Sequence, residues 1–202
     1  MVARPTVRSV IAMKEILLGV CLVMLVMDCR SDQPSESIQT ETDKAKAAIR
    51  ELAVALKTEL KGAMQAGGPV AAIGVCNSQA MPITQKVANE QGLLLSRVSL
   101  KNRNPANLPN EWQNAVLEGF EQQRAAGNDI SSLVWSETVE VDGKQEFRFM
   151  KAIPTGPVCL NCHGTDLSPD VSRILADLYP LDRATGYRDG DIRGAFVVTS
   201  KP

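Results

Sequence analysis

Histidine, aromatic residues and an excess of one charge are what this chain lacks. His163 is the single histidine among 202 residues, aromatic residues make up 4% of the chain, and the formal net charge is -1. Without a basic excess there is no electrostatic footprint for nucleic acid, so nucleic acid is not expected as a partner. The length suits one domain preceded by a targeting segment, and no internal repeat divides it.

Residues 1–29 have the composition of an export signal. Basic residues precede the apolar run 16–27, which is too short to cross a bilayer as a helix. Cys29 follows the run and resembles the lipidated cysteine of bacterial lipoproteins, although Asp28 stands where those signals carry a small residue. An ordinary cleaved signal and a lipid anchor at Cys29 are therefore both left open. Either one predicts an exported, periplasmic protein.

The chain beyond the signal divides into a polar, flexible tether, residues 30–42, and one domain, residues 43–202. Within the domain, apolar residues recur at three- and four-residue steps until the glycine pair 67–68, which predicts a long amphipathic helix. Prolines then predict the starts of two shorter helices. These helices are expected over residues 69–76 and 82–90.

The second half of the domain alternates between β-like and helical patterns. Asp142-Gly143, a dipeptide favoured in tight hairpin turns, separates two β-like runs. The expected elements are a strand over 93–100, a helix over 111–126, strands over 133–141 and 144–153, a short helix over 170–178 and a strand over 194–199. This order predicts an α+β fold with a long N-terminal helix and an antiparallel sheet flanked by helices.

Cys159, Cys162 and His163 form the pattern C-x-x-C-H, by which a c-type haem is attached to protein. Two thiols at this spacing can each add to a haem vinyl group, and the imidazole that follows can bind the iron. The motif predicts one covalently attached haem c, and such haem is attached outside the cytoplasm, in agreement with the export signal. A structural zinc site would need a fourth ligand, for which only Cys76 remains in the mature chain.

The single histidine also limits what the protein can do. Because His163 is committed to the motif, neither a Ser/His/Asp triad nor a metal-hydrolase site is available. A peroxidase would lack its distal histidine, so no enzymatic activity is expected.

The second axial ligand of the iron must come from another residue type, since bis-histidine ligation within one chain is excluded. Every methionine precedes His163, which disfavours the class I cytochromes c, where the ligating methionine lies downstream. Cys76 is an odd thiol in an oxidising compartment and is either the ligand or a buried free cysteine. Met81 and Met64 are lesser candidates.

Four segments carry a resemblance to a known family. AIGVC at 72–76, AMPI at 80–83, SLKNRNPAN at 99–107 and CLNCHG at 159–164 resemble the PAS-like single-haem cytochrome c family, whose members occur alone or as sensor domains of membrane histidine kinases. The resemblance implies a PAS-like fold for the domain and axial ligation by His163 and Cys76. Lys101 or Arg103, in the third segment, is a candidate partner for a haem propionate.

A thiolate opposite an imidazole favours ferric iron and predicts a low reduction potential. We therefore expect a periplasmic sensor of redox state or of a small gas, with a diatomic gas as candidate ligand. The chain contains no output domain, so its signal would pass to a redox or signalling partner protein of unknown identity. The alternative is a low-potential electron-transfer cytochrome.

Overall fold

The computed structural model describes residues 36–201. The predicted export signal, Cys29 included, and the first part of the tether lie outside the described residues. The elements are α1 (Glu36–Gln91), β1 (Leu93–Val98), α2 (Glu111–Ala125), β2 (Val134–Val141), β3 (Lys144–Pro154), α3 (Leu160–His163), α4 (Pro169–Leu178) and β4 (Ile192–Ser200), with 3-10 turns at Pro105–Asn107, Ile130–Ser132 and Pro157–Cys159. Over the described range, no helix has the length and apolarity needed to span a bilayer.

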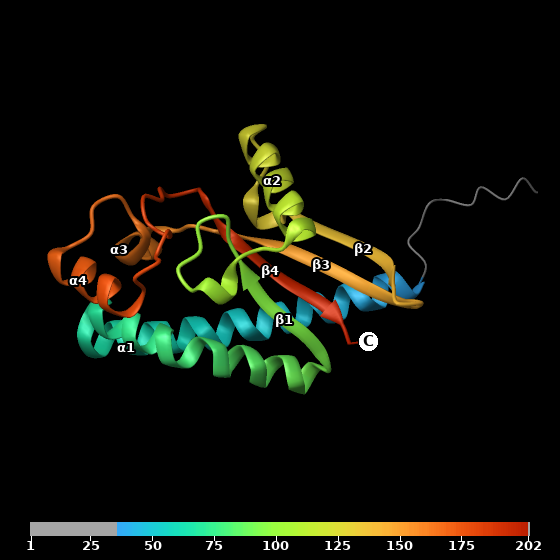
Figure 1. The fold of residues 1–202 in the computed structure, drawn as a ribbon, viewed down its shortest axis with the longest axis horizontal. Coiled ribbons are helices and arrows are strands. Elements are labelled where there is room, and N and C mark those ends of the chain that lie inside the picture. The colour runs from blue at the N-terminus through green and yellow to red at the C-terminus, as the bar shows by residue number, and fades with distance from the viewer. Residues whose placement is uncertain (1–35, 202) are drawn as a thin grey trace, which may run out of the picture. The chain divides into compact units, whose positions relative to one another are not determined.

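Helix α1 consists of two arms, residues 36–66 and 69–91, that form a helical hairpin (Figure 1). Gly67 and Gly68 leave the helical conformation, and Gly68 has φ 67°, a region that favours glycine. The predicted break at the glycine pair is therefore confirmed. The first arm begins at Glu36, so the second part of the predicted tether, residues 36–42, is helical.

The two short helices expected after Gly68 form one continuous arm, with Pro82 inside it. Proline lacks an N–H and usually starts or kinks a helix. Here the helix continues, because the arm buries apolar residues on both sides of the proline: Ala72, Ile73, Ala80 and Val87. The Thr84 hydroxyl also donates a hydrogen bond of 2.7 Å to the carbonyl of Ala80, two residues before the proline.

The four strands form one antiparallel sheet in the order β1-β4-β3-β2. Asp142 and Gly143 connect β2 and β3 with φ 51° and 76°, the positive values that a tight hairpin turn requires. The predicted hairpin, the helix now labelled α2, and the strands β1 and β4 are all confirmed to within a few residues.

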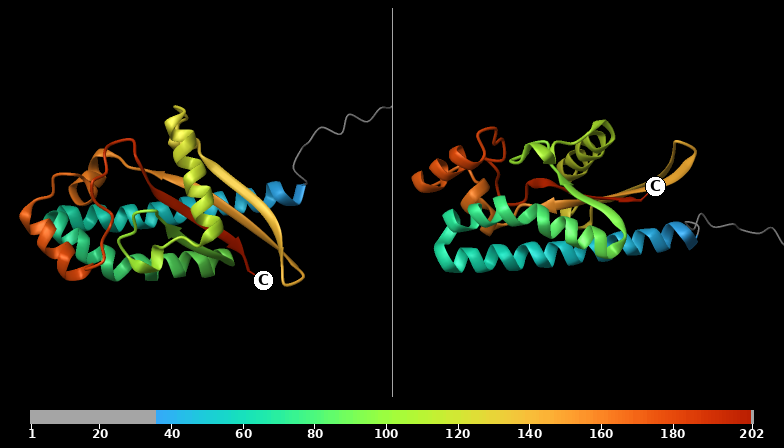
Figure 2. Two further views of the ribbon diagram at one scale, coloured as in Figure 1. Left: turned by 45° about the horizontal axis from the view of Figure 1, so that its top comes forward. Right: turned by 60° about the horizontal axis from the view of Figure 1, so that its bottom comes forward.

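The sheet separates two cores because side chains alternate between its faces. One face packs on the first arm of α1 and the other packs on α2, as the right view of Figure 2 shows. The α1 face includes Leu93, Phe147, Phe149 and Val198, and the α2 face includes Val98, Met150, Ala152 and Val197. This arrangement is the predicted α+β fold, with helices on both sides of an antiparallel sheet.

A third cluster joins the turn end of the α1 hairpin to α4. Ile73, on the second arm of α1, packs against Val171, Leu175 and Tyr179. Nearby, β4 begins against the end of β1 at Gly194, where φ is 155° and a Cβ would collide with the Val98 carbonyl oxygen. Only glycine permits this close approach.

Candidate functional site

A cavity of about 310 Å³ lies between the two arms of α1 and the end of the sheet where β1 and β3 end and β4 begins. The apolar stripe of the first arm explains how it forms. The early residues of that stripe pack on the sheet, whereas the later ones, Ala53, Leu56, Leu60 and Met64, line the cavity. The stripe predicted from the sequence therefore serves two purposes, and its second half faces a space large enough for a ligand.

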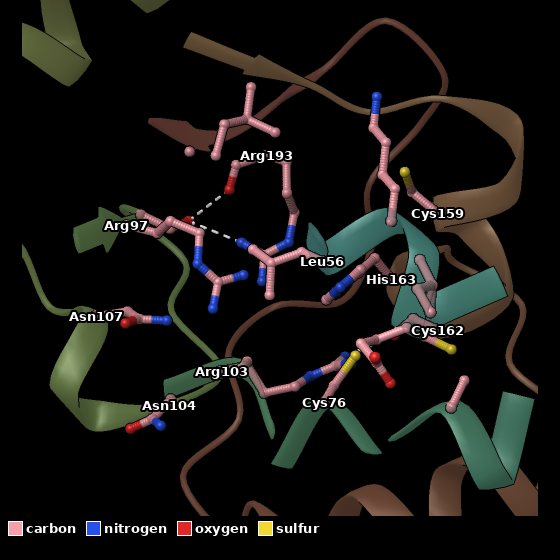
Figure 3. Close-up of a pocket in the computed structure, with 18 of the residues that line it drawn as sticks. Leu56, Cys76, Arg97, Arg103, Asn104, Asn107, Cys159, Cys162, His163 and Arg193 are labelled. Carbon is pink, nitrogen blue, oxygen red and sulfur yellow. Dashed lines mark hydrogen bonds between the residues drawn. The ribbon is translucent and has the colours of Figure 1, made fainter. Parts of the chain in front are cut away.

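All residues of the predicted site line this one cavity. Cys159, Cys162 and His163 reach it from α3 and the turn before it, and Cys76 reaches it from the second arm of α1 (Figure 3). The two thiols and the imidazole lie at positions i, i+3 and i+4 of a helical turn, which places them on one face. Met64 and Met81 also line the cavity.

The imidazole of His163 is held in its neutral form. Its Nδ1 lies 2.7 Å from the Ala184 carbonyl oxygen, so Nδ1–H donates and the lone pair on Nε2 remains available for a metal. Burial, followed by the nearby Arg193 and Arg103, lowers the pKa of His163 to about 2. The ring therefore carries no proton on Nε2 at neutral pH.

The loop that follows α4 fixes the motif in place. The backbone N–H groups of Gly186 and Tyr187 each donate a 2.9 Å hydrogen bond, to the carbonyls of Gly164 and His163 respectively. The Tyr187 ring meets the imidazole edge-on, with 6.2 Å between the ring centroids. The motif is thus anchored through its main chain, while Cys159, Cys162 and His163 line the cavity.

Arg103 supports the motif from the other side. Its guanidinium donates to the Cys162 carbonyl at 2.6 Å, to the Ala184 carbonyl at 3.3 Å and to the Asp182 carboxylate at 3.1 Å. Lys101, the other residue suggested for a propionate, places its Nζ 4.4 Å from the centroid of the Tyr187 ring. Arg103 is occupied by protein groups, which disfavours it as a propionate partner.

Cys76 is exposed, and it lines the cavity. The protein around the Cys76 thiol still partly desolvates it, which raises its pKa, while the positive charges of Arg97 and Arg103 act in the opposite direction. Burial likewise raises the pKa of the Cys162 thiol. The cysteines of the described range, Cys76, Cys159 and Cys162, are all free, so each thiol remains available for another bond.

Two arginines of the cavity, Arg97 and Arg193, were not singled out from the sequence. For Arg97 a signal existed. Residues 93, 95 and 97 share one face of β1 by alternation, so an arginine continues a stripe begun by two leucines on the face toward α1. Arg193 is distinguished only by its position before Gly194, and that position does not indicate a role in the site.

The donor set fits a haem better than a directly bound metal ion. Within residues 36–201, no three His, Cys, Asp or Glu side chains gather closely enough to hold a metal ion, which disfavours the zinc alternative. A c-type haem instead needs two thiols at one edge and an imidazole beside them, with an apolar wall for the ring. The cavity supplies these, together with one further thiol.

Comparison with known proteins extends this result. A profile of the Tll0287-like family (Tll0287) matches residues 31–200 of the chain. The crystal structure of the cyanobacterial haem protein Tll0287 is similar with a TM-score of 0.59 and 24% sequence identity, over 81% of this chain and 95% of that one. At this identity the likeness concerns the fold, which is PAS-like as the sequence resemblance implied. A search of curated proteins gave no match.

Proposed function

The chain belongs to the Tll0287-like family, and on that premise we propose that it binds one haem c, attached through Cys159 and Cys162, with His163 and Cys76 as axial ligands. The observation that carries the proposal is that a C-x-x-C-H motif and a lone thiol from a helix far earlier in the sequence line one cavity. The structurally similar Tll0287 is itself a haem protein, which supports the choice of cofactor.

The chain's own residues prepare the site for such a group. The Ala184 carbonyl accepts a hydrogen bond from Nδ1–H and so orients the imidazole of His163. The positive charges of Arg97 and Arg103 act against the desolvation that raises the pKa of Cys76, and so partly favour its thiolate. When bound, the haem iron would supply a one-electron redox centre and, once Cys76 leaves it, a position at which a diatomic gas can bind.

We propose further that the protein senses redox state or a small gas. A thiolate bond to iron is favoured in the ferric state, so reduction or gas binding would release Cys76. The released thiol lies on the helical arm that also carries Ile73, which packs against α4 through Val171 and Leu175. A change at the iron would thereby alter the contact between this arm and α4, a surface on which a partner protein could detect it.

The proposed location is the periplasm, because haem c is attached outside the cytoplasm and residues 1–29 have the composition of an export signal. A lipid anchor at Cys29 would add a membrane attachment without changing the domain.

Absorption and EPR spectra of the purified ferric protein test the ligand assignment, with the intact mass establishing covalent haem. We expect Cys76→Ala to lose the low-spin thiolate spectrum while keeping the haem mass. The matched controls are Met64→Ala and Met81→Ala, which remove the other candidate ligands of the same cavity and should leave the spectrum unchanged. An unaltered low-spin spectrum in Cys76→Ala would remove Cys76 from the iron.

The same samples, reduced and exposed to carbon monoxide or nitric oxide, separate the two functions. Rapid gas binding with loss of the thiolate signature supports sensing. A reduced protein that stays six-coordinate and unreactive would contradict it and favour the low-potential electron-transfer cytochrome instead.

A further inference from the structure

The cavity contains more positive charge than its protein partners neutralise. Four cations line it, Lys57, Arg97, Arg103 and Arg193, against one carboxylate, Glu59. Arg103 is paired with Asp182. Among the described residues, neither Arg97 nor Arg193 forms a salt bridge. Buried or half-buried guanidinium groups normally have an acidic partner, because removing a charge from water is costly.

Arg193 is the more constrained of the two. Its Nη1 donates to the Ser99 hydroxyl at 3.1 Å and to the Lys101 carbonyl at 3.4 Å, and its guanidinium lies 5.3 Å from the Tyr187 ring centroid. Its Nε is fully buried and has no hydrogen-bond partner. The side chain is therefore fixed through one edge, while the Nε edge, which suits side-on binding of a carboxylate, is left unsatisfied.

Arg97 lies on the same side of the cavity. It is half-buried on β1, and the ionisable groups whose charges raise its pKa are Cys76 and Tyr179, neither of them a carboxylate. In Figure 3, Arg97 and Arg193 lie on one side of His163, whereas Cys159 and Cys162 lie on the other.

The cysteines and the arginines lie on opposite sides of the cavity (Figure 3), as the vinyl and propionate edges of a haem would require. The vinyl groups that form thioether bonds and the two propionates occupy opposite halves of the macrocycle. A haem attached through Cys159 and Cys162 therefore directs its carboxylates to the far side of the cavity, where the two unpaired guanidinium groups lie.

We propose that Arg97 and Arg193 form the propionate-binding end of the cavity, and that this pair, rather than Lys101 or Arg103, neutralises the haem carboxylates. The inference rests on the proposed haem attachment. It assigns the two arginines a positioning role: they fix the carboxylate edge of the cofactor, and the motif fixes the thioether edge.

Redox titrations over a range of pH test the assignment on the haem-loaded protein. A propionate beside a guanidinium has a lowered pKa, so removing the cation raises the carboxylate's proton affinity about tenfold or more. The midpoint potential depends on pH around the pKa of the propionate. We expect Arg97→Gln and Arg193→Gln each to move that pH-dependent region toward neutral pH by about one pH unit or more. Arg193→Lys, which keeps the charge, should largely restore the wild-type profile.

Two further variants serve as controls. Arg148→Gln removes a half-buried arginine on the opposite face of the sheet, where Arg148 is paired with Glu146 and stacks on Trp112, and should leave the profile unchanged. Lys101→Gln tests the alternative partner suggested by the sequence. If Arg193→Gln does not fold, Arg97→Gln, at the less buried of the two arginines, tests the propionate assignment by itself.

The outcomes separate this inference from the proposed function. A wild-type protein whose intact mass includes no haem would overturn both. Covalent haem in the wild type with unchanged profiles in Arg97→Gln and Arg193→Gln would overturn the propionate assignment alone. A shift in Lys101→Gln without one in the two arginine variants would likewise overturn it, and would place the propionates at Lys101.

Discussion

At the scale of single residues, Arg103 connects more of the site than any predicted ligand does. It joins the loop after β1 to the Cys162 carbonyl, to Asp182 and to Ala184, whose carbonyl also accepts from His163. The Asp182 carboxylate in turn accepts from the Ala184 N–H at 2.8 Å. One guanidinium thus sets the backbone against which the imidazole is oriented.

Replacing this arginine should destabilise the fold strongly. Arg103 and Asp182 have side chains only 11% and 10% exposed, so Arg103→Gln leaves a buried carboxylate without its cation. We expect a loss of about 3–5 kcal/mol in the free energy of unfolding, measured by urea denaturation.

The matched control for that measurement is Arg173→Gln on α4. Its salt bridge to Asp170 has side chains 72% and 66% exposed, and its loss should cost less than about 1 kcal/mol. Equal losses in the two variants would contradict the role assigned to Arg103.

The residues of the site differ in how far the sequence could predict them. The motif and the odd thiol were recognisable because their chemistry depends on residue type and spacing, and the structure brings them to one cavity. The roles of Arg97 and Arg193 depend on what surrounds each guanidinium in space. Spacing along the chain does not contain that information. Arg103, which the sequence offered as a propionate partner, proved to be hydrogen-bonded to protein groups.

At the scale of elements, two glycines of α1 differ in what their positions require. Gly62 lies in the first arm with open space where a Cβ would be, whereas Gly68 forms the reversal with φ 67° and ψ -161°. Only the second conformation requires glycine, since other residues rarely adopt it.

Alanine at these two positions should therefore have opposite effects on stability. Gly62→Ala removes backbone freedom from the unfolded chain and should raise the free energy of unfolding by roughly 0.5–1 kcal/mol. Gly68→Ala should lower it by about 1–3 kcal/mol. Thermal or urea unfolding of the two variants measures both, and destabilisation by Gly62→Ala would show that its surroundings are tighter than the structure indicates.

The elements themselves were largely predictable, apart from the boundaries that packing decides. Strands and α2 followed from alternation, helical periodicity and the Asp142-Gly143 turn. The continuous second arm of α1 did not, because local rules for Pro82 favour a new helix start, and the burial of Ile73 and Val87 on either side of it outweighs them.

At the scale of the whole molecule, the proposed export and haem attachment can be tested by replacing or removing the N-terminal segment. The family match begins at residue 31 and the described fold at Glu36. Replacing residues 1–29 with an unrelated export signal should therefore preserve covalent haem, whereas producing residues 30–202 without any signal should abolish it. Intact mass spectrometry of the two products measures the outcome. Covalent haem in the signal-less protein would contradict attachment outside the cytoplasm.

The positions of Cys76 and His163 have one more consequence, which concerns the unfolded chain. The two residues line one cavity although they lie far apart in the sequence. A bond from each to a common atom closes a loop of about 90 residues, and closing a loop of this length by a cross-link removes roughly 4–5 kcal/mol of chain entropy from the unfolded state. If this cross-link opens on reduction, the free energy of unfolding would depend on the oxidation state of the cofactor and would be larger in the oxidised protein.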